Sequence, residues 1–246
     1  MISHQLVSFQ GSFEDPVFWY VSLQVFLFGV AHFLALLLIA RRLSPSFQNG
    51  FIAFGVALGA STRLAWLVFG VASHDSEAHS LVFGILLLLL SLLSVPSYHQ
   101  RAMPAHGRMD WAAASVWMLI VSLAFTHLSA TSNLSVSPDL IYAITAASIG
   151  YLLAIGFSWL LFVNARKIRG LILATSWIVG VCGLRLLIEG LDGDGRWDFS
   201  SPKSLGTILF WLAFLSGVIA AVFVKRARKQ CLPEHHLGRA SFLLRR

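Results

Sequence analysis

Seven apolar stretches, each about 20 residues long, dominate the sequence and limit the folds open to it. A helix of about 20 apolar residues crosses the hydrocarbon core of a membrane. Charged residues make up only 12% of the chain, against about 25% in soluble domains. The prolines all lie at the ends of these stretches or between them, so each helix can run unbroken. We therefore expect an all-α membrane protein, a bundle of seven transmembrane helices at about residues 17–40, 51–73, 79–97, 110–130, 139–163, 171–191 and 204–224.

The basic residues predict the orientation of this bundle. Fourteen of the 18 lysines and arginines follow spans one, three, five and seven, whereas only Arg196 and Lys203 lie on the opposite side. By the positive-inside rule, the N-terminus is outside or lumenal and the C-terminus is cytosolic. We therefore expect a lumenal segment (1–16), a seven-helix domain (17–224) and a basic cytosolic tail (225–246).

Basic charge at the ends of apolar spans indicates a membrane partner rather than a nucleic acid. We expect no nucleic-acid binding. The lipid bilayer itself is the expected partner of the seven spans. The tail (225–246) carries seven basic residues and one acid, and each basic residue near an anionic leaflet contributes about 1 kcal/mol of attraction. Anionic lipids are therefore the expected partners of the tail, which we expect to lie on the membrane surface.

Arg63 and Arg185 are the basic residues within predicted spans. At about 1.5 Å per residue, they lie roughly 18 and 21 Å along their helices, at similar depth. An intramembrane charge usually marks a paired or functional position, and Glu189 lies one turn after Arg185, where the two can pair. We expect spans two and six to be neighbours, with Arg63, Arg185 and Glu189 in one polar cluster. Such a cluster either holds the helices in register or forms a lumen-facing site for an anion or acidic head group.

The remaining motifs argue against catalysis and against a bound cofactor. No dinucleotide fingerprint, P-loop or cluster of zinc ligands occurs. A haem-binding bundle needs two histidines at matching depth on facing helices. His32 is placed deep toward the cytosol, whereas His127 is placed near the outer surface. We expect no cofactor, no metal site and no enzymatic activity, and His32 is expected to be a hydrogen-bonded packing residue.

Three short features carry local expectations. Gly55 and Gly59 form a G-x-x-x-G pattern, which allows close helix contact, and we expect packing within the bundle rather than dimerisation. Asn133 begins an Asn-Leu-Ser acceptor for N-glycosylation in a short outer loop, so we expect poor occupancy. Cys231 follows span seven and is a candidate for reversible acylation, with an unmodified thiol as the alternative.

Several segments together resemble one family of membrane proteins. Spans two and six each contain an arginine, span three is followed by YHQRAMP (98–104), and span seven closes in VFVKRARK. Over about residues 17–229, the chain resembles the seven-helix tobamovirus-multiplication proteins of plants and the related orphan receptor-like proteins of animal lysosomes. The resemblance implies an endomembrane protein without known catalysis, which recruits cytosolic partners such as a small GTPase.

The sequence therefore favours a non-enzymatic integral membrane scaffold or receptor-like protein, in a eukaryotic endomembrane, that engages cytosolic partners. Two alternatives remain open. One is a permease for a small solute or anion that uses the intramembrane arginines. The other is an accessory subunit of a larger membrane complex, in which the arginines hold helices together. A polar path through the bundle would favour the permease, and an outer face covered by protein would favour the subunit.

Overall fold

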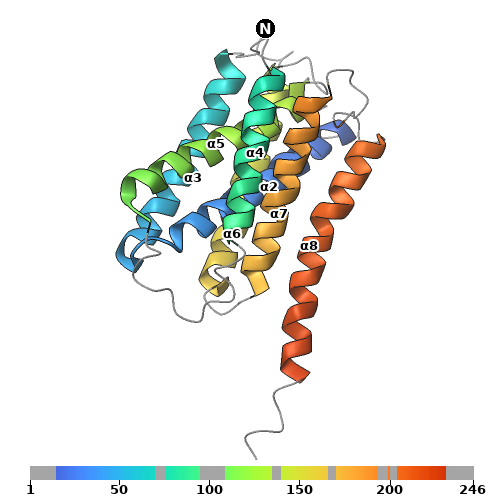
Figure 1. Cartoon of the computed structure of the whole chain (residues 1–246). Coiled ribbons are helices and arrows are strands. Elements are labelled where there is room, and N and C mark those ends of the chain that lie inside the picture. The colour runs from blue at the N-terminus through green and yellow to red at the C-terminus, as the bar shows by residue number, and fades with distance from the viewer. Residues whose placement is uncertain are drawn as a thin grey trace, which may run out of the picture.

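The computed structural model describes residues 15–69, 76–94, 109–134, 140–165, 170–192, 199 and 204–230. These residues form an all-α structure, and each of its helices overlaps one of the apolar stretches (Figure 1). The helices are α2 (Pro16–Ala40), α3 (Pro45–Phe69), α4 (Ser76–Ser94), α5 (Trp111–Leu134), α6 (Leu140–Ala165), α7 (Gly170–Leu191) and α8 (Leu205–Gln230). The all-α fold class predicted from the sequence is confirmed.

Two helices extend six residues beyond the bounds that hydropathy predicted. α3 begins at Pro45 rather than near residue 51, because proline is well suited to the first turn of a helix and hydropathy does not register polar first turns. α8 continues to Gln230 rather than ending near residue 224, because lysine, arginine, alanine and glutamine are all good helix formers. The first six residues of the predicted tail (225–246) therefore continue the last helix.

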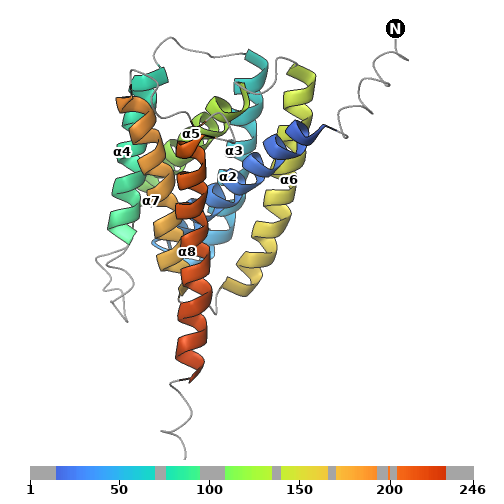
Figure 2. The same cartoon turned by 90° about the vertical axis from the view of Figure 1, so that its right-hand side faces the viewer.

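The central helix of the fold is α2. It packs against α3, α5, α6 and α7 and crosses the bundle obliquely (Figures 1 and 2). The carboxylate of Asp15 caps its first turn by accepting a hydrogen bond from the backbone N–H of Val17 at 2.9 Å. Every residue from Phe28 to Ala40 is buried. Such a helix has to be apolar on all sides, and His32 is the one polar residue in that stretch.

Glycines set the distance between α4 and α7, which lie side by side (Figure 1). A Cβ atom on Gly84 of α4 would lie 2.6 Å from the backbone nitrogen of Leu187. A Cβ atom on Gly190 of α7 would lie 2.6 Å from the backbone nitrogen of Leu81. The two backbones are therefore in direct contact, as is common between helices in membranes.

The G-x-x-x-G pattern of α3 serves packing within the bundle, as expected. Gly55 faces the side chains of Leu36 and Met118, and Gly59 faces His32 and Tyr151. Both glycines are buried against other helices of the same chain. This pair therefore brings α3 close to α2, α5 and α6.

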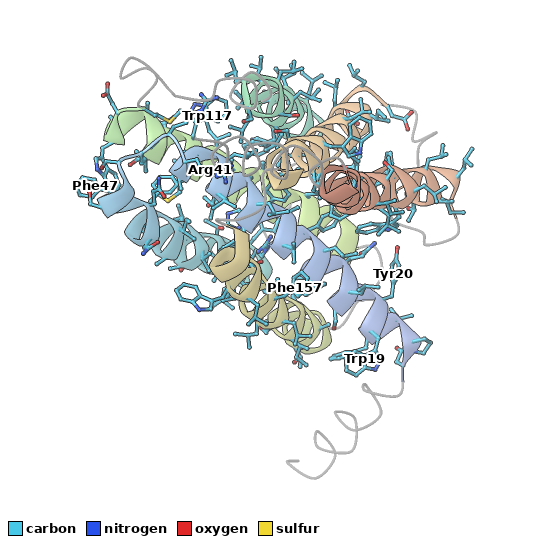
Figure 3. The ribbon with its side chains drawn as sticks, turned by 90° about the horizontal axis from the view of Figure 1, so that it is seen from below. Trp19, Tyr20, Arg41, Phe47, Trp117 and Phe157 are labelled. Carbon is cyan, nitrogen blue, oxygen red and sulfur yellow. The ribbon has the colours of Figure 1, made fainter. Side chains whose placement is uncertain are left out.

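Large apolar side chains cover the outside of the bundle. Trp19 and Phe47, for example, point away from it (Figure 3) and are about half exposed. Within the described residues, four helices are long and apolar enough to cross a membrane, namely α2, α4, α5 and α7. Shorter apolar stretches lie in α6 (Ile144–Leu160) and α8 (Leu205–Gly217). This pattern is that of an integral membrane protein.

α8 stands at the edge of the bundle and packs mainly against α7. The indole N–H of Trp177 on α7 donates a hydrogen bond of 2.8 Å to the carbonyl oxygen of Ala213 on α8. The far end of α8 extends past the ends of the other helices (Figure 2). The last helix therefore carries the start of the basic segment away from the bundle.

Candidate functional site

Arg185 lies on α7 and is buried among aromatic rings. Its guanidinium carbon is 5.3, 5.1 and 5.0 Å from the ring centroids of Phe28, Phe199 and Phe210. Its Nε donates a hydrogen bond of 2.9 Å to Oε1 of Glu189, one turn further along α7. The expected pairing of these two residues is thus present. A carboxylate and three ring faces stabilise this buried cation, and the rings link α7 to α2 and α8.

Arg63 lies on α3, six residues before the end of the helix at Phe69, and is only 7% exposed. Two hydrogen bonds reach α5: Nε donates to Oγ of Ser129 at 3.3 Å, and Nη2 donates to the carbonyl oxygen of Phe125 at 3.5 Å. The guanidinium carbon lies 4.2 Å from the ring centroid of Tyr151 on α6. Nη1 is buried and makes no hydrogen bond with the described residues. Arg63 therefore stands where three helices meet, without a carboxylate partner in the described part of the chain.

Tyr151 and His32 extend this site to α2. The hydroxyl of Tyr151 donates to the carbonyl oxygen of Val56 at 3.1 Å and lies 3.4 Å from Nδ1 of His32. Nε2 of His32 is 3.2 Å from Oγ of Ser122 on α5. Gly59 provides the space for the imidazole, because a Cβ atom there would collide with it. His32 is thus a hydrogen-bonded packing residue, as the sequence predicted.

The predicted cluster of Arg63, Arg185 and Glu189 requires a correction, because the structure divides it into two sites. α3 packs against α2, α5 and α6, whereas α7 packs against α2, α4 and α8. Figure 3 shows α2 between α3 on one side and α7 on the other. α3 and α7, which carry Arg63 and Arg185, are therefore separated by the central helix α2. Equal distances along two helices predict similar depth, but they do not predict which helices are neighbours.

The sequence did not predict that His32 and Arg63 would share a neighbour. Counting residues along its helix placed His32 deep toward the cytosol, whereas the ring of Tyr151 lies against Arg63 and its hydroxyl lies near His32. The oblique path of α2 (Figure 2) explains the error, because a tilted helix gains less depth per residue. Tyr151 itself gave no signal, since a tyrosine in an apolar stretch is common.

A second polar contact joins the start of α4 to α5. Oγ of Ser80 and Nε2 of His127 share a hydrogen bond of 2.7 Å, and the ring centroids of His79 and His127 are 6.5 Å apart. The sequence placed His127 near the outer surface but did not predict its contacts with Ser80 and His79. Among the described residues, no group of three or more His, Cys, Asp or Glu side chains could hold a metal ion.

Of the two predicted modification sites, the structure describes Asn133 but not Cys231. Cys231 lies outside the described residues, so its acylation stays a prediction. Asn133 lies in the last turn of α5 rather than in a free loop.

Comparison of the chain with protein-family models, with curated proteins and with solved structures finds no match. The site is therefore interpreted from its own geometry.

Glycosylation of Asn133 is expected to be rare. Glycosylated asparagines normally lie in accessible surface loops, and this one lies in a helix end. Glycosidase treatment of the full chain from membranes should leave the mass of most molecules unchanged, and N133Q should migrate like the wild type. A shift in most molecules that is lost in N133Q would contradict this expectation.

Proposed function

We propose that this protein is a non-enzymatic integral membrane scaffold or receptor-like protein that engages cytosolic partners. The proposal includes seven spans, an outer or lumenal N-terminus and a cytosolic basic tail. From the resemblance it takes a eukaryotic endomembrane as location and a small GTPase as the kind of partner. The structure contributes one observation that supports a scaffold, namely how the helices are joined.

Each of the seven described helices makes a side-chain hydrogen bond to another helix. Helices in lipid gain no hydrophobic stabilisation from each other, so close packing and hydrogen bonds hold them together. A bundle joined in this way keeps its shape and presents its ends in a fixed arrangement, which is what a scaffold requires. The bonded pairs are His32–Ser122, Val56–Tyr151, Thr62–Thr126, Ser80–His127, Ser91–Ser176 and Trp177–Ala213.

The proposed orientation is supported by the arrangement of helix ends. Nη2 of Arg42, just after α2, donates a hydrogen bond of 2.6 Å to the carbonyl oxygen of Leu93 at the end of α4. The C-terminal ends of α2 and α4 thus lie on the same side of the bundle, which the proposed topology requires. Protease digestion of sealed, right-side-out vesicles should remove an N-terminal epitope and spare a C-terminal one if the native membrane is the plasma membrane. In sealed organelle vesicles with the cytosolic face outward, the C-terminal epitope should be removed, and the opposite pattern would contradict the orientation.

The function is tested by the native mass of the gently solubilised full chain. A scaffold should appear in an assembly larger than its own 27.0 kDa. A variant with glutamine at the seven basic positions of the tail (225–246) should be released as the free chain, because the tail provides the charge that attracts partners. An assembly that survives these substitutions would favour the accessory subunit instead. Anion flux into liposomes containing the protein alone would favour the permease, a possibility to which the interior charge of Arg63 points.

A further inference from the structure

The described helices accept only some of the hydrogen-bond donors of the Arg63 guanidinium. It carries five N–H groups, and two of them make the contacts of 3.3 and 3.5 Å to α5, longer than the usual 2.7–3.2 Å. The carbonyl oxygen of Phe125 is also shared, because Oγ of Ser129 donates to it at 2.7 Å. Nη1 is buried and has no partner among the described residues. The edge of the guanidinium is therefore poorly satisfied.

The charge of Arg63 is not balanced by any side chain among the described residues. Its described contacts are a hydroxyl, a backbone carbonyl and the ring of Tyr151, all of them neutral. Arginine remains protonated in proteins, and a buried unpaired charge is costly. Arg185 shows the contrast within the same chain, because it has both Glu189 and an aromatic surround.

We propose that Arg63 binds an oxyanion, the carboxylate or phosphate group of a ligand, through the Nη1 edge of its guanidinium. Two parallel N–H groups of arginine match two oxygens of a carboxylate or phosphate. The ring of Tyr151 covers one face of the guanidinium, so the N–H donors at its edge are the groups that would bind the ligand's oxygens. The same group can belong to a soluble anion or to the head group of an anionic lipid. This inference goes beyond the proposed function, since a scaffold requires no ligand.

The test measures thermal unfolding of the full chain in a neutral detergent at constant ionic strength. The probes are inorganic phosphate, acetate and, in mixed micelles, phosphatidic acid, with chloride and phosphatidylcholine as references. A saturating oxyanion, at about 100 times its dissociation constant, should raise the unfolding midpoint by roughly 5–10 °C. A response to phosphate or acetate assigns a soluble anion, and a response to phosphatidic acid alone assigns a lipid head group. No response to any of the three would overturn the proposal.

Variants localise the effect. R63Q should lose the response and, because an unbalanced charge is removed, should unfold at a higher temperature than the wild type without oxyanion. R63K keeps the charge but not the paired donors and should bind about tenfold more weakly. R42Q is the matched control, because Arg42 is an arginine outside the helices whose contact is to Leu93, and it should respond like the wild type. The proposal would be overturned if oxyanions raised the unfolding midpoint of R63Q as much as that of the wild type. If R63Q does not fold, the same comparison is made between R63K and the wild type.

Discussion

Replacing Glu189 by glutamine is expected to lower the free energy of unfolding by about 3 kcal/mol. Removing one partner of a buried ion pair costs about 3–5 kcal/mol, because the other charge stays buried. Glutamine keeps an oxygen that can accept a hydrogen bond from Nε of Arg185. This hydrogen bond reduces the loss by about 1 kcal/mol. The side chain of Arg185 is only 2% exposed, so water compensates little. Titration with denaturing detergent in mixed micelles measures the change.

A double-mutant cycle separates the ion pair from general damage. R185M places a flexible apolar side chain among the rings of Phe28, Phe199 and Phe210, where sulfur–aromatic contacts are favourable. The double variant R185M/E189Q should therefore lie within about 1 kcal/mol of the wild type, since buried pairs are often replaced by apolar residues without loss. A double variant that is less stable than E189Q would contradict the pairing. E189Q should also leave the oxyanion response of Arg63 unchanged, because the two arginines occupy separate sites.

The helices could be predicted because a membrane span is a local property of sequence. A stretch such as 17–40 needs only enough consecutive apolar residues to cross the bilayer, and α2 begins and ends within one residue of that range. The pair of Arg185 and Glu189 was predictable for the same reason, since i and i+4 neighbours lie on one face of any helix. The start of α3 and the end of α8 could not be predicted from hydropathy, because both helices continue into polar residues beyond their apolar stretch.

The site around Arg63 could be predicted only in part, because it depends on contacts between distant spans. Burial of a charged residue follows from its place in an apolar stretch, and Arg63 is indeed buried. Its partners on α5 and α6 follow from the order of helices around α2 and from the tilt of α2. The sequences of apolar helices of similar length carry little information about the order of the helices or about the tilt of α2. Sequence periodicity is weak here, because α2 is apolar on all sides.

Alanine at Gly84 is expected to lower the free energy of unfolding by about 2 kcal/mol. The added Cβ would lie 2.6 Å from the backbone nitrogen of Leu187 and 2.9 Å from the carbonyl oxygen of Gly183. Overpacking usually costs about 1–3 kcal/mol, and the upper end applies because backbone atoms cannot rotate aside as a side chain can. The gain in helix propensity from glycine to alanine, about 1 kcal/mol in water, opposes this loss but does not exceed it. The same detergent titration measures the effect.

Gly156 provides the matched control for this substitution, because a Cβ atom there meets nothing within 4 Å. G156A should be neutral or slightly stabilising, whereas G84A should be destabilising. G84A should also separate α4 from α7, the helix that carries Arg185, while α3, α5 and α6 around Arg63 keep their contacts. Its oxyanion response should therefore persist at temperatures where the variant is folded. A G84A protein as stable as G156A would show that α4 and α7 are not in backbone contact, and the role of the glycines in this pair would have to be abandoned.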